Sequence, residues 1–169
     1  MTLEARLVDI TTLSVDAIVN AANTALAPGG GVCGAIHRAA GPELAAACAH
    51  LAPCPTGEAR ITPGFRLPAR YVIHAVGPIW QGGAQGEAAL LASAYRTSIE
   101  LATDRGLRTV AFPAISTGIF GYPLADATRI AVATVTDAAD RPGSIESIVF
   151  ACFSDDVLRE YAKRGVTIR

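Results

Sequence analysis

Lysine is nearly absent from this chain. Lys163 is the only one, and arginine supplies the remaining positive charge. A Schiff-base enzyme and a P-loop nucleotide-binding site both need a lysine in the body of the fold. We therefore exclude both classes.

Paired cysteines are also missing. Cys33, Cys48, Cys54 and Cys152 form no CxxC pair and no zinc-finger spacing, so we expect free thiols in a reducing cytoplasm. The nearest approach to a metal-ligand cluster is formed by Cys48, His50 and Cys54, at the end of a predicted helix and in a loop with proline. We do not expect a metal site there, and we predict no cofactor.

Long apolar runs are absent too. No segment approaches the about 20 apolar residues that span a bilayer, and the first ten residues, MTLEARLVDI, lack the apolar core of a signal peptide. Hydrophobic residues make up 51% and charged residues 17% of the 169 residues, which excludes disorder and fits a single domain over residues 1–169. A net charge of -1 disfavours electrostatic binding of nucleic acid. We expect a monomer without membrane contact.

Hydrophobic periodicity predicts strands that alternate with helices, with glycine and proline between them. The predicted strands are Arg6–Ile10, Ala17–Ala21, Ala59–Thr62, Tyr71–Val76, Thr109–Ile115, Ser147–Phe153 and Val166–Arg169. The predicted helices are Gly34–Ala40, Pro42–Leu51, Gly86–Arg105, Leu124–Ala139 and Asp155–Arg164. This order predicts an α/β fold with a sheet covered on both faces, a three-layer α/β/α sandwich.

Two glycine-rich loops follow buried strands and precede helices. They comprise Asn20–Gly34 and Pro113–Gly121. Ligands of such sheets bind at the carboxyl ends of the strands, and backbone amides at a helix N-terminus bind phosphate without lysine. Two such loops suit a ligand with two phosphates, although each one could also be a tight turn.

Two catalytic or nucleotide-binding motifs are not supported. Gly29, Gly31 and Gly34 satisfy G-x-G-x-x-G, but the dinucleotide motif requires glycine directly after the strand. Ser116 lacks the preceding glycine of a nucleophile elbow. Neither a Rossmann site nor an α/β-hydrolase site is expected.

Several polar residues have two interpretations. Asn20 and Asn23 suit either a local turn or a ribose hydroxyl, and Asp9 suits a turn or the amino group of a base. Cys33 and His37 share a helix face, which leaves covalent thiol chemistry open. His74, within an apolar strand, is expected to be a hydrogen-bonded core histidine.

The chain resembles the macro domain family, specifically the MacroD-type ADP-ribose hydrolases. The matching stretches occur in family order and cover nearly the whole chain: VDAIVNAANTAL, GGGVCGAIHRAAGPEL, CPTGEARIT, YVIHAVGPIW and FPAISTGIFGYP. The resemblance implies a mixed sheet of about six strands. It also implies binding of ADP-ribose and ADP-ribosylated proteins, and hydrolysis of mono-ADP-ribose esters on acidic side chains and of O-acetyl-ADP-ribose.

The same resemblance implies roles for individual residues. Asp9 would accept the adenine amino group and Ile10 would contact the ring, whereas Ala22 and Asn23 would meet the distal ribose. The two glycine loops would hold the distal ribose and the diphosphate through Gly30, Gly31, Val32, Cys33, Gly34, Ser116, Thr117, Gly118, Ile119 and Phe120. Asn23, Cys33 and His37 occupy the positions associated with catalysis.

Cys33 is the main departure from the family pattern, which reads GGGVDGAIHRAAG. The aspartate thought to activate water is a cysteine here, and a thiol is mostly neutral near pH 7. Pro28 also replaces the first of the family's four glycines. Similar viral macro domains carry a small residue at this position and are thought to use a water held by phosphate and backbone. The sequence therefore leaves two functions open, a hydrolase and a catalytically weakened reader of ADP-ribose.

Overall fold

The computed structural model describes residues 1–169 and contains seven strands, five α-helices and one 3₁₀ turn. The strands are Thr2–Leu7 (β1), Ala17–Ala21 (β2), Ala59–Pro63 (β3), Tyr71–Ala75 (β4), Thr109–Phe112 (β5), Ser147–Cys152 (β6) and Thr167–Ile168 (β7). The helices are Gly31–Ala40 (α1), Pro42–Leu51 (α2), Glu87–Asp104 (α3), Leu124–Ala139 (α4) and Asp155–Lys163 (α5), and the 3₁₀ turn is Ile10–Thr12 (η1).

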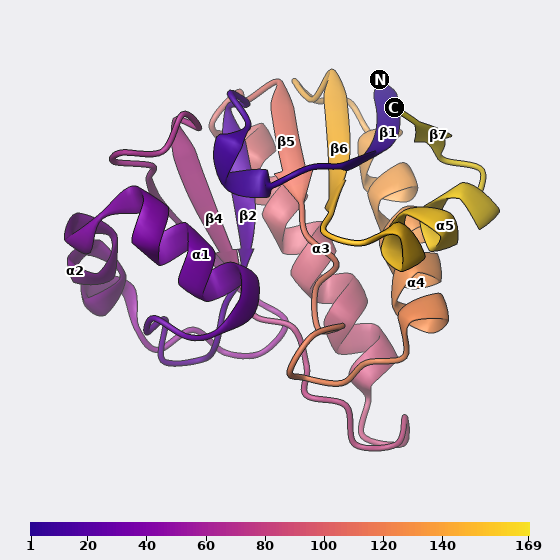
Figure 1. Ribbon diagram of the computed structural model, residues 1–169, viewed down its shortest axis with the longest axis horizontal. Coiled ribbons are helices and arrows are strands. Elements are labelled where there is room, and N and C mark those ends of the chain that lie inside the picture. The colour runs from indigo at the N-terminus through magenta and orange to yellow at the C-terminus, as the bar shows by residue number, and fades with distance from the viewer.

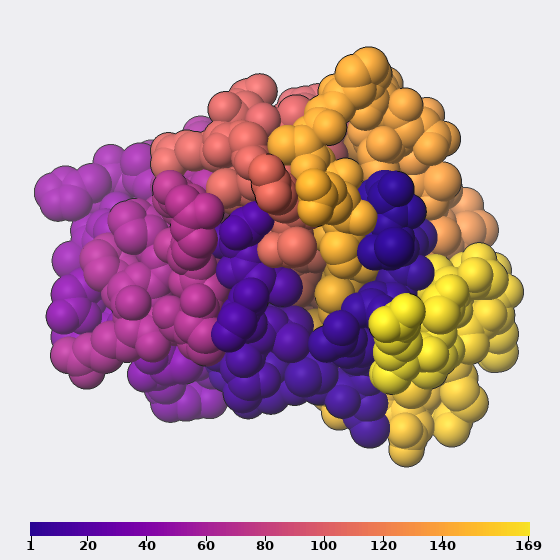
Figure 2. Space-filling view, turned by 90° about the horizontal axis from the view of Figure 1, so that it is seen from above, coloured from indigo at the N-terminus to yellow at the C-terminus, as the bar shows by residue number.

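All seven strands form one sheet in the order β3-β4-β2-β5-β6-β1-β7. Only β3 is antiparallel to its neighbour, so the sheet is mixed. From the side where most strands begin, the segment leading into β6 lies between β5 and the N-terminal segment (Figure 2). The parallel strands therefore end at the same edge, where the connecting loops gather.

The side chains of each central strand alternate between two separate cores. In β6, Ile148 and Phe150 pack into one core and Val149 and Ala151 into the other. Helices α3, α4 and α5 cover the first core, and α1 and α2 cover the second (Figure 1). A sheet buried on both faces needs such continuous apolar strands. The predicted three-layer α/β/α sandwich is confirmed.

The first helix is longer than expected and begins in the glycine loop. Gly30 is its N-cap, and Gly41 ends it with a φ of 89°. Pro42 occupies the first turn of α2, where its missing N–H costs no hydrogen bond. The predicted break at Gly41-Pro42 is confirmed, whereas the predicted start at Gly34 lies one turn too late.

The predicted first strand, Arg6–Ile10, is wrong. The strand is β1, Thr2–Leu7, and it pairs with β6 over its whole length. Asp9 instead caps η1, because its carboxylate accepts the backbone N–H of Thr11 at 3.0 Å. The other predicted elements agree with the structure within a few residues at each end.

Candidate functional site

A cavity of about 850 Å³ lies over the carboxyl ends of β2, β5, β6 and β1. These four strands are neighbours, so the cavity extends over three inter-strand spacings, about 14 Å. Its walls come mainly from the two predicted glycine loops and from the ends of β1 and β6 with the segments that follow them, and Gly77, which follows β4, also contributes. The lining residues are Leu7, Val8, Asp9, Ile10, Ala21, Ala22, Asn23, Gly29, Gly30, Gly31, Val32, Cys33, Ala35, Gly77, Pro113, Ala114, Ile115, Ser116, Thr117, Gly118, Ile119, Phe120, Ala151, Cys152 and Phe153.

The first glycine loop is folded around the backbone of Ala27. The Asn23 side chain donates from Nδ2 to the Ala27 carbonyl at 2.9 Å and accepts from the Ala27 N–H at 3.0 Å. The Cys33 thiol donates to the same carbonyl oxygen at 3.7 Å. Asn23 therefore performs the turn role that the sequence allowed. Its Nδ2 retains a second hydrogen and its Oδ1 a second lone pair, so contact with a ribose stays possible.

Several backbone N–H groups of both loops have no hydrogen-bond acceptor within the protein. In the first turn of α1, Gly31, Val32 and Cys33 have no acceptor within the protein, and the cap residue Gly30 supplies no side chain. In the second loop, the same is true of Ser116, Gly118, Ile119 and Phe120. Both sets belong to residues that line the cavity. Grouped free amides of this kind bind phosphate or another anion.

Charged side chains contribute little to the cavity. Asp9 is the only charged residue among those that line it, and no arginine, lysine or histidine does. An anion bound here would be held by backbone amides rather than by side-chain cations. This agrees with the scarcity of lysine in the sequence.

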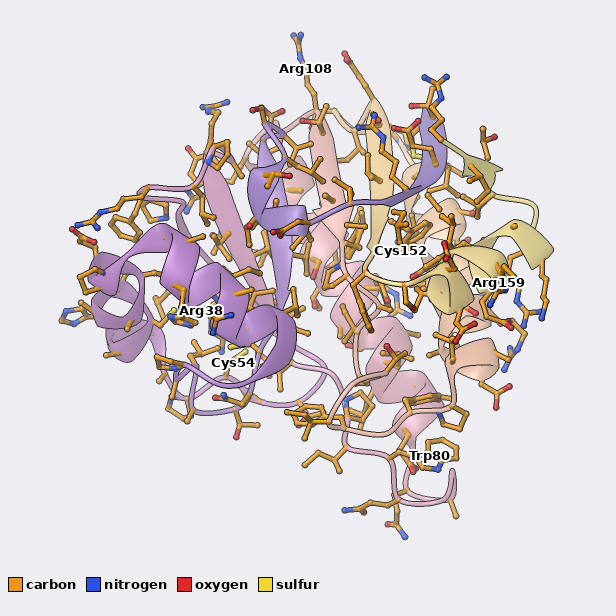
Figure 3. The ribbon with its side chains drawn as sticks, in the orientation of Figure 1. Arg38, Cys54, Trp80, Arg108, Cys152 and Arg159 are labelled. Atoms are coloured by element: carbon orange, nitrogen blue, oxygen red, sulfur yellow. The ribbon has the colours of Figure 1, made fainter.

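The second glycine loop is held from outside by the loop that follows β4. The Trp80 N–H donates to the Phe120 carbonyl at 2.8 Å, and the Trp80 ring packs against Tyr122 with centroids 4.7 Å apart. Figure 3 shows Trp80 at the opposite end of the molecule from Arg108, which immediately precedes β5. Trp80 therefore packs over the second glycine loop.

A buried carboxylate orders the same outer loop. Glu87 accepts the N–H groups of Gln81 and Gly83 at 2.9 Å and that of Gln85 at 2.6 Å. Burial alone would raise the pKa of Glu87, but these hydrogen bonds outweigh it and the pKa is lowered. The carboxylate therefore stays ionised and fixes the loop that carries Trp80.

The two glycine loops approach each other across the cavity. A Cβ on Gly30 would lie 3.2 Å from Cδ1 of Ile119. Ile119 is itself 85% exposed. The start of α1 and the second loop therefore lie next to each other at the cavity rim.

The end of the cavity near β1 and β6 has a different character. Asp9 and Ile10 line it as predicted, together with Phe153, which directly follows β6 and is 78% exposed. Phe153 is not among the predicted site residues, because the apolar pattern predicts it as the last residue of a strand, whereas β6 ends at Cys152. An exposed aromatic ring beside a carboxylate suits a planar base that carries an amino group.

A buried polar cluster lies behind the wall formed by Cys33. The Asn20 amide donates to Nδ1 of His74 at 3.2 Å and to the Cys33 sulfur at 3.7 Å. Nε2 of His74 contacts the Thr62 hydroxyl at 3.0 Å, and that hydroxyl donates to the Pro63 carbonyl. These contacts place the proton of a neutral imidazole on Nε2.

The environment of this cluster keeps its groups uncharged. Burial, together with nearby His37, lowers the pKa of His74 to about 3. Burial and nearby Cys33 raise the pKa of Cys48 to about 11, and its sulfur lies 3.5 Å from Nε2 of His74. The prediction that His74 is a hydrogen-bonded core histidine is confirmed.

Two of the predicted site residues do not line the cavity. A Cβ on Gly34 would lie 2.5 Å from the Gly29 carbonyl oxygen, so the glycine lets the first loop pack against α1. His37 lies one turn further along α1, with its Nδ1 buried and unpartnered and its pKa lowered by burial. The cavity contains every other predicted site residue. Of the weak metal candidates, Cys48 and Cys54 are buried whereas His50 is exposed.

Comparisons with known proteins agree with this fold. The Macro domain family model matches residues 19–131. A macro domain-containing protein of Chlorobaculum tepidum is 60% identical over 155 residues, which cover 92% of this chain and 90% of the relative. A protein of Citrobacter rodentium named O-acetyl-ADP-ribose deacetylase is 54% identical over 159 residues, which cover 92% of this chain and 90% of the relative.

Solved structures of macrodomains are also similar to this chain. The Oceanobacillus iheyensis macrodomain with ADP has a TM-score of 0.88 and 41% identity, over 94% of this chain and 86% of that one. The Trypanosoma brucei macrodomain in complex with ADP-ribose has a TM-score of 0.89 and 44% identity, over 95% of this chain and 68% of that one. The chain belongs to the macro domain family, and its similarity to O-acetyl-ADP-ribose deacetylases supports the MacroD-type branch. None of its helices has both the length and the apolarity needed to cross a membrane.

Proposed function

We propose that this chain binds ADP-ribose across the ends of β1, β6, β5 and β2, as a single macro domain over residues 1–169. The observation that carries the proposal is the pair of free-amide groups in one cavity. The adenine would lie near Asp9, Ile10 and Phe153, and the diphosphate against the amides of Ser116–Phe120. The distal ribose would then reach Ala22, Asn23 and the first turn of α1.

We further propose that the chain hydrolyses mono-ADP-ribose esters on acidic protein side chains, and O-acetyl-ADP-ribose, without a metal. Water adds to the ester, so that one product keeps a ribose hydroxyl and the other is a free carboxylic acid. Asn23 would orient the distal ribose with its remaining hydrogen-bonding capacity. The bound diphosphate and nearby amides would hold the attacking water. The substrates are thus ADP-ribosylated proteins and O-acetyl-ADP-ribose.

Cys33 has a spatial role in this proposal rather than a chemical one. Cys33 is 6% exposed and its thiol donates to the Ala27 carbonyl, so it shapes the wall beside Asn23. His37 is kept as a candidate that would act through α1, since it does not line the cavity. The second candidate function is a reader that binds ADP-ribose without hydrolysing it, and the replacement of the family aspartate by Cys33 favours it.

The test is release of ADP-ribose from a protein that is mono-ADP-ribosylated on glutamate. We would compare the unchanged chain with Cys33→Ala and Cys33→Asp, each at a saturating enzyme concentration. We expect turnover by the unchanged chain, a rate within about three-fold for Cys33→Ala, and a faster rate for Cys33→Asp because a positioned base contributes about 10²- to 10⁴-fold.

Each alternative gives a different pattern. Release by Cys33→Asp alone identifies a reader built on a hydrolase fold. A thousand-fold loss in Cys33→Ala, with unchanged affinity for ADP-ribose, identifies thiol chemistry instead. Titration of the same three proteins with ADP-ribose separates loss of binding from loss of turnover.

A further inference from the structure

Tyr95 of α3 reaches the second glycine loop from beneath the sheet. Its hydroxyl oxygen accepts the N–H of Ile115 at 3.2 Å, and its O–H donates to the carbonyl of Pro113 at 3.4 Å. Neither backbone group has another partner in the protein. Tyr95 is 1% exposed, and its ring packs 5.2 Å from that of Phe112, centroid to centroid.

The tethered segment immediately precedes a strained turn. Ser116 follows Ile115 and has a φ of 68°, in the left-handed region that a non-glycine residue rarely adopts. Gly77 makes room for it, since a Cβ there would lie 2.2 Å from the Ser116 hydroxyl oxygen and 2.5 Å from Cγ2 of Ile115. The conformation of the turn at Ser116 therefore depends on where the backbone of Pro113 and Ile115 is held.

The free amides begin at that same turn. Ser116, Gly118, Ile119 and Phe120 have N–H groups without acceptors, and all four residues line the cavity. Anion binding by backbone amides depends on their mutual direction, which a shift of the preceding residue changes. The position of Ile115 thus sets where these donors lie.

A hydroxyl is not needed at this position for packing alone. A phenyl ring would fill the same apolar space beside Phe112, whereas a buried O–H is costly unless it is hydrogen-bonded. Burial also raises the pKa of Tyr95, so its O–H remains available as a donor. The oxygen bonds to two backbone groups, those of Pro113 and Ile115, and the buried Tyr161 hydroxyl, which has no hydrogen-bond partner of its own, lies near it.

We propose that Tyr95 is a positioning residue for diphosphate recognition: its hydroxyl, without touching the ligand, holds Pro113 and Ile115 so that the amides of Ser116–Phe120 keep their geometry. This inference rests on the proposed binding of ADP-ribose. It assigns the hydroxyl to the phosphate part of the ligand and not to the base. The proposal gives the Tyr95 hydroxyl oxygen the role of holding the loop and leaves the ring the role of packing in the core.

The test is Tyr95→Phe, titrated with ADP-ribose, ADP and adenosine. We expect the dissociation constants of ADP-ribose and ADP to rise about ten-fold, because the Ile115 N–H loses its buried acceptor. Adenosine, which has no phosphate, should bind within two-fold of the unchanged protein. Ser98→Ala is the matched control, because it removes a buried hydroxyl from the same helix that bonds only to the Ala94 carbonyl.

Hydrogen exchange of the Ile115 amide in the ligand-free proteins supplies a second readout. Exchange should be faster in Tyr95→Phe and unchanged in Ser98→Ala. Tyr95→Phe keeps the ring beside Phe112, and urea unfolding of both variants shows that each is folded before it is titrated. Unchanged affinity for ADP-ribose, or an equal loss for adenosine, overturns the proposal. If the unmodified protein itself does not bind ADP-ribose, the proposed function fails and this inference with it.

Discussion

Asn23 and Cys33 donate to the same carbonyl oxygen, that of Ala27, at 2.9 and 3.7 Å. The two side chains approach it from the strand end and from the first turn of α1. This shared acceptor ties the loop between them to the helix. It also means that residue 33 serves the loop as a donor, which a carboxylate could not do.

Cys33→Asp should therefore be less stable than the unchanged protein even if it is a faster enzyme. The aspartate would place a charged acceptor at a position 6% exposed, facing the Ala27 carbonyl. We expect a loss of about 1–3 kcal/mol in the free energy of unfolding, the cost of an unsatisfied buried group. Cys33→Ser, which keeps a donor, should lose less than Cys33→Asp; equal losses in urea unfolding would contradict this explanation.

Asn23→Ala should weaken binding of ADP-ribose more than that of ADP. The variant loses the contacts proposed for the distal ribose, which ADP lacks. We expect a rise of about ten-fold in the dissociation constant of ADP-ribose and less than three-fold for ADP, from the loss of a hydrogen bond of about 1 kcal/mol with some loosening of the loop. Calorimetric titration of both ligands checks this. A loss of the same size for both would assign Asn23 to the loop alone.

Phe153→Ala should weaken binding of every ligand that contains adenine. Stacking of a base on an aromatic ring contributes about 1–3 kcal/mol, so the dissociation constant of ADP-ribose should rise about five-fold or more. Phe65→Ala is the control, because Phe65 is also a partly exposed aromatic residue but does not line the cavity. Ribose 5-phosphate lacks the base, and its binding should not distinguish the two variants.

The buried His74 should make the protein less stable as the pH falls below about 6.5. Its pKa is about 3 in the folded protein and near 6.5 in the unfolded chain. Above pH 6.5 the imidazole is neutral in both states, whereas below it the unfolded chain takes up a proton that the folded protein does not. Stability should then fall by about 1.4 kcal/mol per pH unit toward pH 3.

Urea unfolding between pH 5 and 7.5 measures this effect while most carboxylates stay ionised. His74→Asn should flatten the dependence, and His50→Asn, at an exposed histidine, should leave it unchanged. The lowered pKa of His37 acts in the same direction, so a residual slope should remain in His74→Asn. An unchanged slope in that variant would show that His74 is not its source.

The sequence predicted the layers of this fold better than its local details. Apolar runs such as Ile148–Cys152 are typical of a strand buried on both faces. The shift of β1 was missed because Asp9 and Thr11 form a cap, a local hydrogen bond that hydrophobic periodicity does not report.

The candidate site was predicted where it depends on backbone loops and missed where it depends on side-chain exposure. Glycine and strand order indicated both loops that line the cavity. Phe153 continues an apolar pattern, and the sequence does not reveal that the strand ends one residue earlier. Tyr95 lies on a helix far along the chain from the loop it supports, so only the three-dimensional packing relates its hydroxyl to Ile115.

The place of β6 between β5 and β1 has a consequence for biosynthesis. A ribosome makes β1 first, but both neighbours of β1 in the sheet, β6 and β7, are made near the end of the chain. While residues 8 to 146 are synthesised, β1 has no strand to pair with. The Asp9 end of the cavity is completed only after β6 has entered the sheet, so a nascent or prematurely terminated chain that stops short of β6 cannot offer the ligand a finished site.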